Sequence, residues 1–201
     1  MAIPTEQIKK LRELTGAGVL ETKHALEQAN GDFDQAAAVL RAKGQARAEK
    51  KAERAATQGL IETYVHSDIH SAGKVGAMLE LNCETDFVAR TAEFQQLAHD
   101  LVLHIAATNP KYISPNDIPT SVREQAESDF RAQVESEGKK GPLVDKIIQG
   151  KMESYFKDHC LLRQPFIRDE SITIQDLVQS VAMKMRENIV VRRFVRYQLG
   201  E

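Results

Sequence analysis

The chain has 201 residues, and its 27 Lys and Arg against 29 Asp and Glu give a formal net charge of −2, which argues against a protein that mainly coats nucleic acid or an anionic membrane. Hydrophobic residues make up 42% and charged residues 28%, as in globular proteins, so we expect a packed core in one or two domains. Two cysteines, Cys83 and Cys160, are too few for a disulfide scaffold. Neither an export signal nor a membrane span is recognisable in the sequence, so we expect a cytoplasmic protein.

Residues 1–44 predict three short helices that form a small bundle. Thr5 is the expected N-cap of the first helix, which ends near the glycines of residues 15–18. The second helix is expected over residues 19–29, and the third closes at Gly44. Three helices of this length bury a very small core, so the bundle is expected to be marginally stable by itself.

Residues 45–57 contain no large apolar side chain and are rich in strong helix formers, which predicts a solvated helical linker. The basic residues of segment 43–54 have a second interpretation as a phosphate-binding stripe. Glu49 and Glu53 interrupt this stripe, and no aromatic residue lies in it for base stacking. The composition therefore favours the solvated helix.

The core is expected over residues 58–201, where the pattern first changes to alternation. It predicts strands at residues 60–65 and 75–81, joined as an antiparallel hairpin through a turn at residues 67–73. Apolar residues between Phe94 and Ala106 then recur at the spacing of an amphipathic helix.

Two polar helices follow, at about residues 121–137 and 143–157, and predict a protruding αα-hairpin. A short helix from Thr173 to about Met185 and a third strand over residues 189–199 complete the chain. A small antiparallel sheet with helices segregated to one face belongs to the α+β class, which is the fold that we predict.

No residues have the spacing of a metal site or of a catalytic site. His66 and His70 are expected on a strand and a turn, and His99 and His104 diverge on one helix. The sequence has neither a phosphate-binding glycine loop nor a nucleophile elbow. We expect no metal, no cofactor and no covalent chemistry.

Residues 80–90 stand out because an alternating strand runs into five polar or small residues and then presents Phe87 and Val88. A phenylalanine in this place has two interpretations. It can seal the corner between strand and helix, or the turn can hold the ring outward as an anchor for another protein. Period and spacing do not choose between them.

The same segment resembles the Thr-Asp-Phe-Val motif of the bacterial translation elongation factor Ts family, without a departure over residues 80–90. Residues 11–19 and 187–197 are also similar to this family, so the resemblance spans essentially the whole chain. Departures lie at residues 19–22, where the family often has Met-Met-Asp-Cys, and at His24 in place of a frequent Lys. The chain resembles the short form, with one core repeat.

The resemblance implies a guanine-nucleotide exchange factor for elongation factor Tu, with a ubiquitin-associated-type (UBA-like) domain at the N-terminus. It implies that the Phe87 side chain intrudes between two helices of the G domain of Tu, which disturbs the Mg²⁺ site and the phosphate-binding loop. It also implies that the N-terminal bundle grips another helix of that domain. Carried onto this chain, the expected contacts with Tu are Thr85, Asp86, Phe87, Val88, Arg12, Val19, Leu20 and Lys23.

Two other functions remain as alternatives. The first is an adaptor that binds proteins without promoting exchange. The second is an RNA-binding protein that uses its basic residues, although we expect no direct contact with nucleic acid. The basic residues in question are segment 43–54, Lys184, Arg186, Arg192, Arg193 and Arg196.

We further expect a homodimer, because short-form members of the resembled family carry one core repeat where long forms carry two. A sheet of three strands also has two open edges, and residues 189–195 are apolar enough to suggest burial on both faces. A closed two-fold interface commonly covers such a surface. The alternative is that helices from residue 92 onward cover the sheet within one chain.

Overall fold

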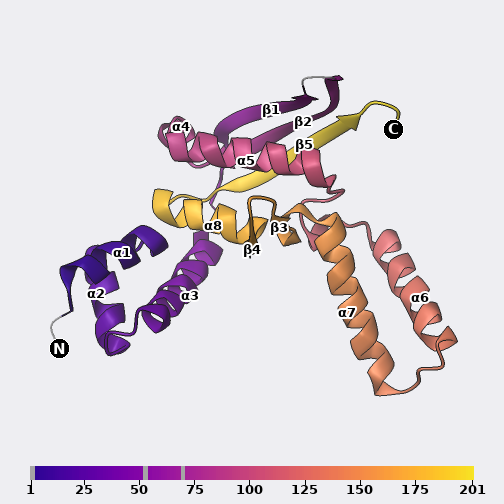
Figure 1. Ribbon diagram of the computed structural model, residues 1–201, viewed down its shortest axis with the longest axis horizontal. Helices are drawn as coiled ribbons and strands as arrows, with labels where there is room; N and C mark the ends of the chain where they lie inside the picture. Colours follow the sequence, from indigo (N-terminus) through magenta and orange to yellow (C-terminus); the bar gives the residue numbers. More distant parts are fainter. Residues whose placement is uncertain (1–2, 52–53, 69–70) are drawn as a thin grey trace. The chain divides into compact units, whose positions relative to one another are not determined.

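The computed structural model describes residues 3–51, 54–68 and 71–201, and it confirms an α+β fold with a small antiparallel sheet (Figure 1). The helices are α1 (Thr5–Thr15), α2 (Val19–Gln28), α3 (Phe33–Lys51), α4 (Asp86–Ala89), α5 (Ala92–Thr108), α6 (Thr120–Ser136), α7 (Pro142–His159) and α8 (Ile174–Met185), with 3₁₀ turns η1 (Pro115–Asp117) and η2 (Leu161–Arg163). The strands are β1 (Gln58–Asp68), β2 (Ser71–Cys83), β3 (Pro165–Phe166), β4 (Asp169–Thr173) and β5 (Val190–Gln198).

The chain forms two compact units, each built from several segments. The first unit comprises Met1–Thr63, Met78–Asp100 and Asp176–Phe194. The second unit comprises Tyr64–Ala77, Leu101–Gln175 and Val195–Glu201. Neither unit corresponds to a single stretch of sequence, and the division between the units falls within α5.

Helices α1, α2 and α3 pack around a cluster of small and aliphatic side chains in the first unit. Its buried members are Leu11, Ala25, Leu26, Ala29, Ala36, Ala37 and Leu40. The prediction that Thr5 is the N-cap of α1 is wrong. Pro4 takes that position, and its carbonyl oxygen accepts from the N–H of Ile8 at 3.3 Å. Proline suits the start of a helix since its φ is already restricted, here to −61°.

Gly44 does not end the third helix, contrary to the prediction. Helix α3 continues through it to Lys51, whereas residues 54–57 are not helical. A glycine costs a helix about 1 kcal/mol relative to alanine, and the alanine, lysine, glutamate and arginine residues around Gly44 outweigh that cost.

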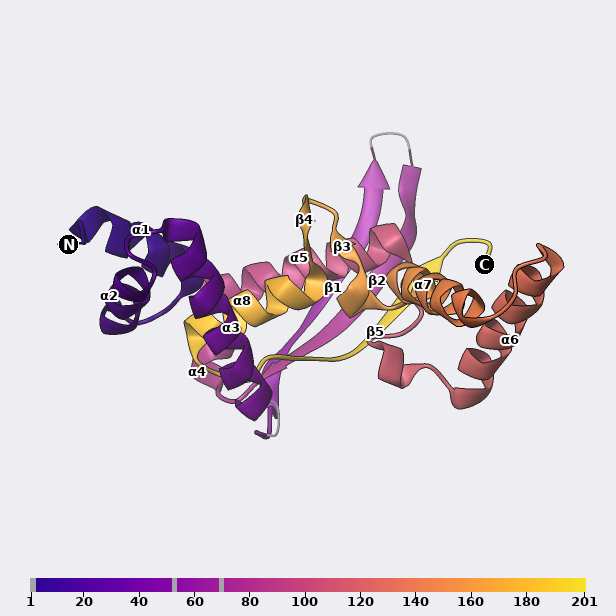
Figure 2. The same ribbon diagram turned by 90° about the horizontal axis from the view of Figure 1, so that it is seen from below.

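Strand β2 lies between β1 and β5 in the three-stranded sheet. Its alternate residues Ala77, Leu79, Leu81 and Cys83 are buried, whereas Met78 between them is exposed. Figures 1 and 2 both draw α5 alongside this sheet, and α5 carries several buried side chains, among them Phe94 and Leu97. Strands β1 and β2 are longer than predicted, whereas β5 is one residue shorter at each end, and the centre of the predicted turn, residues 69–70, lies outside the described residues.

The predicted αα-hairpin is confirmed by α6 and α7, which lie side by side in the second unit (Figure 1). The two helices share a hydrophobic core of their own. Its buried members are Ile118, Val134, Val144, Ile148, Met152, Phe156 and Cys160. The ribbon of β3 and β4, which pairs Phe166 with Asp169, was not predicted because strands this short carry no recognisable alternation.

Buried His104 on α5 is expected to make the stability of the protein depend on pH. Its Nε2 lies 2.9 Å from Oε1 of Gln164, its Nδ1 has no hydrogen-bond partner among the described residues, and burial lowers its pKa from the ordinary value of 6.5. The unfolded chain therefore binds a proton more readily, and the free energy of unfolding should fall as the pH drops below 6.5. Urea unfolding at a series of pH values between 7.5 and 5 should show a shallower dependence for His104→Gln than for the wild type, and identical dependences would contradict this assignment.

Candidate functional site

The predicted contact residues 85–88 form one compact helical turn at the end of the central strand. Strand β2 ends at Cys83, and Thr85 is the N-cap of helix α4, with its Oγ1 accepting from the N–H of Val88 at 3.5 Å. Asp86 occupies the first turn and forms an ion pair of 2.8 Å with Arg90. Strand, cap and helix thus follow one another without a flexible connection.

Phe87 points into solvent at this turn. Its side chain is 80% exposed, whereas the next residue, Val88, is buried. Phe94, in the first turn of α5, is fully buried as well. Phe87 therefore does not seal the corner, and its ring is available to another molecule.

The two ends of the turn are tied to the core. The thiol of buried Cys83 donates to the carbonyl oxygen of Thr85 at 3.1 Å, and burial raises the pKa of this thiol. The hydroxyl of Thr91 donates to the carbonyl oxygen of Val88 at 2.8 Å and accepts from the N–H of Phe94 at 3.3 Å. These bonds connect α4 to the start of α5.

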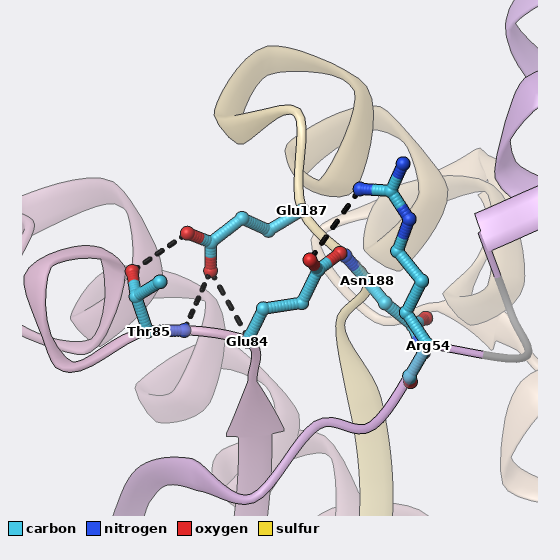
Figure 3. Close-up of polar contacts among 5 residues, drawn as sticks. All are labelled: Arg54, Glu84, Thr85, Glu187 and Asn188. Carbon is cyan, nitrogen blue, oxygen red and sulfur yellow. Dashed lines mark hydrogen bonds and ion pairs between the residues drawn. The ribbon is translucent and has the colours of Figure 1, made fainter.

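A glutamate from a distant part of the sequence holds the start of the turn (Figure 3). Oε2 of Glu187 accepts hydrogen bonds from the N–H groups of Glu84 at 3.1 Å and Thr85 at 3.0 Å. Oε1 of Glu187 accepts from the hydroxyl of Thr85 at 2.6 Å. One carboxylate thus binds three donors on two consecutive residues.

The reverse contact is made by Glu84 (Figure 3). Its Oε1 accepts from the N–H of Asn188 at 2.7 Å, and its Oε2 pairs with the guanidinium of Arg54 at 3.4 Å. The side-chain amide of Asn188 donates to the carbonyl oxygen of Arg54 at 2.9 Å. The network joins three segments: the residues before β1, the end of β2 and the connection from α8 to β5.

The predicted site residues did not include the four members of this network, which are Arg54, Glu84, Glu187 and Asn188. Glu187 and Asn188 lie in one of the segments that resemble the family, but no periodicity shows what a carboxylate touches 102 residues away. The available signal was a polar pair placed directly before an apolar strand.

The second predicted group, Arg12, Val19, Leu20 and Lys23, lies on α1 and α2 and is accessible to solvent. Val19 is 53% and Leu20 is 73% exposed in the first turn of α2. Lys23 lies one helical turn after Val19 and pairs with Glu27 at 3.8 Å, while Arg12 is exposed on α1. Neighbouring Leu14, which was not predicted, is also exposed.

The basic residues of the RNA-binding alternative include two that are engaged within the protein. Arg193 pairs with Glu80 at 2.6 Å, and the Arg196 guanidinium donates to the carbonyl oxygen of Ala106 at 3.0 Å. The side chains of residues 45–53 are outside the described part. Over the described ranges, no group of three or more His, Cys, Asp or Glu is placed to hold a metal ion, and no helix is long and apolar enough to cross a membrane.

Comparison with known proteins matches nearly the whole chain to one family. The family model described as elongation factor TS covers residues 5–201. A protein of Coprothermobacter proteolyticus named elongation factor Ts is 49% identical over 201 residues, which cover 100% of both chains. A protein of the same name from Fervidobacterium nodosum is 47% identical, with 100% of both chains covered. Another from Thermodesulfovibrio yellowstonii is 50% identical, with 100% of this chain and 98% of the relative covered.

Proposed function

This chain belongs to the elongation factor Ts family, and from that premise we propose that it releases GDP from elongation factor Tu by inserting the turn of residues 85–88 against the G domain. Family membership itself implies a nucleotide exchange factor of translation elongation. The proposal adds the mechanism, the contact residues and a cytoplasmic location. It assigns no covalent step and no direct contact with nucleic acid.

The mechanism is a coupling between two binding equilibria. A GTPase of this kind holds GDP through the N–H groups of its phosphate loop, a lysine and Mg²⁺. A partner that binds the nucleotide-free form more tightly than the GDP form must weaken GDP binding by the same factor. A side chain that moves helices beside the loop and the Mg²⁺ site supplies this difference in affinity, and GTP then enters the empty site.

The single observation that supports this function best is the exposed Phe87 on a turn that hydrogen bonds hold at both ends. Aromatic anchors contribute much of the binding energy of many interfaces. An anchor whose backbone is already held in place in the free protein loses less conformational entropy on binding than one on a mobile loop. Phe87 therefore suits insertion between elements of a partner.

The function is tested by mixing the protein with Tu that carries a fluorescent GDP and excess unlabelled nucleotide. We expect the fluorescence to decay faster as the concentration of the factor rises. Binding to Tu without faster decay would instead support the adaptor. Tight RNA binding without any effect on Tu would support the RNA-binding alternative.

We also propose a homodimer in which the outer face of the sheet meets a second copy. Within one chain, Arg192, Arg193 and Val195 of β5 are exposed, so the burial of this strand on both faces stays a prediction that requires the second copy. Exposed apolar side chains do occur on all three strands. They are Ile61, Val65, Met78, Val195 and Tyr197.

Light scattering at micromolar concentration should therefore give a mass near twice the 22.5 kDa of one chain. The substitution Val195→Glu places a charge on the proposed interface and should lower the mass to that of one chain, because an unpaired charge is costly to bury. A wild-type mass of 22.5 kDa that does not change on concentrating would exclude the dimer.

A further inference from the structure

We propose that Glu187 is the positioning residue of the exchange turn: its carboxylate sets the direction in which Phe87 leaves the protein. This inference rests on the proposed function, since it concerns how the same turn is presented to elongation factor Tu. Glu187 lies outside the Thr-Asp-Phe-Val motif and is not exposed enough to act as an anchor itself.

The ring of Phe87 receives little guidance from packing of its own. With 80% of the side chain exposed, its direction depends on the backbone of α4 and therefore on how that short helix begins. A helix of four residues is too short to be stable by itself, so its start must be held from outside. The surrounding contacts supply that support.

Glu187 controls the start of α4 through the hydroxyl of Thr85. The hydroxyl donates its one proton to Oε1 of Glu187 at 2.6 Å, which leaves its oxygen lone pairs free to accept from the N–H of Val88 at 3.5 Å. The same carboxylate fixes the N–H groups of residues 84 and 85 through Oε2. Hydrogen bonds to a carboxylate are stronger than those between neutral groups, so the cap is well anchored.

Glu187 is itself held in place by its neighbours (Figure 3). Helix α8 ends at Met185, and Arg186 adopts a left-handed conformation with a φ of 60°, which turns the chain toward β5. The following N–H, that of Asn188, is bound by the Glu84 carboxylate at 2.7 Å. Each of the two segments therefore binds backbone N–H groups of the other, which fixes both together.

Three substitutions separate the reach of the Glu187 side chain from its charge. Glu187→Gln keeps the length of the side chain and one carbonyl acceptor but removes the charge. Glu187→Asp keeps the charge but shortens the side chain by one methylene. Glu187→Ala removes both the reach and the charge. If Glu187 positions the turn, the maximal rate of GDP release at saturating factor should fall about threefold for Gln, which keeps the reach but only one acceptor oxygen and no charge, and about tenfold for Asp and Ala. Full activity of Asp together with loss in Gln would overturn the proposal, because charge alone would then suffice.

A double-mutant cycle with Phe87→Ala shows whether Glu187 acts through the ring. Without the ring there is nothing to orient, so Glu187→Asp should slow exchange little further in the Phe87→Ala background. Independent, multiplicative effects would refute the positioning role. The free energy of unfolding in urea, measured for every variant, separates a slower exchange rate from a loss of folded protein. If Glu187→Ala does not fold, the Asp and Gln variants decide whether Glu187 positions the turn.

The outcomes also distinguish this proposal from the function on which it rests. If wild-type protein does not accelerate GDP release at all, the proposed function fails. If wild type accelerates release and all Glu187 variants do so equally well, only the positioning role fails. Glu170→Ala, which removes an exposed glutamate of β4, is the matched control and should exchange at the wild-type rate.

Discussion

Replacing Phe87 by alanine is expected to slow the release of GDP from elongation factor Tu at least tenfold, which corresponds to about 1.4 kcal/mol at the transition state. The stability of the free protein should change by no more than about 0.5 kcal/mol, because the ring is exposed and little packing is lost. Stopped-flow exchange rates at saturating factor and urea unfolding measure the two quantities separately.

Phe94→Ala is the matched control for this prediction. Phe94 lies seven residues after Phe87, in the first turn of α5, and is fully buried, so its removal should cost about 3–5 kcal/mol of folding free energy. If Phe87→Ala lowered stability in this way while sparing the exchange rate of the folded fraction, Phe87 would be a core residue and the insertion mechanism would be wrong.

The double substitution Val19→Ala with Leu20→Ala is expected to weaken the binding of Tu about tenfold. Both side chains are exposed in the first turn of α2, so their apolar surface is free to be buried by a partner. Each buried CH₂ contributes about 0.8 kcal/mol, so a tenfold loss of affinity, about 1.4 kcal/mol, requires the complex to bury only about two of the carbon groups that these truncations remove. Titration calorimetry with nucleotide-free Tu measures the dissociation constant.

Leu26→Ala provides the contrast within the same helix. Leu26 belongs to the buried cluster of the bundle, so its truncation should cost about 2–5 kcal/mol of stability and reduce binding only through loss of folded bundle. The proposed contact surface on α2 would be excluded if the Val19 and Leu20 variant bound Tu as tightly as wild type while remaining folded.

Elements with a clear hydrophobic period could be predicted from the sequence. The amphipathic helix around Phe94 to Ala106 and the alternation in β2 each repeat the same local pattern over many residues, and both were found where they were expected. The turn of residues 85–88 could also be singled out, because its resemblance to the family lies within a few consecutive residues, and its contact with Tu stays a proposal. Local boundaries were less certain, as Gly44 shows, because propensities on both sides of one residue compete there.

The direction of the Phe87 ring was decided only by the tertiary structure. The sequence left two interpretations open, and the structure leaves Phe87 exposed whereas Val88 and Phe94 are buried. The support beneath it comes from Glu187 and Asn188, whose partners at Glu84 and Thr85 are more than 100 residues away in sequence.

The sequence by itself therefore determined the fold class, the principal helices and strands, and the family, because periodicity and motif are properties of neighbouring residues. Only the tertiary structure decided which side chains are exposed and which carboxylate caps which backbone group. Hydrogen bonds depend on distances of about 3 Å between atoms that folding brings together from remote segments. No pattern along the chain encodes such a pairing, and for this reason the residues that hold the turn became visible only in three dimensions.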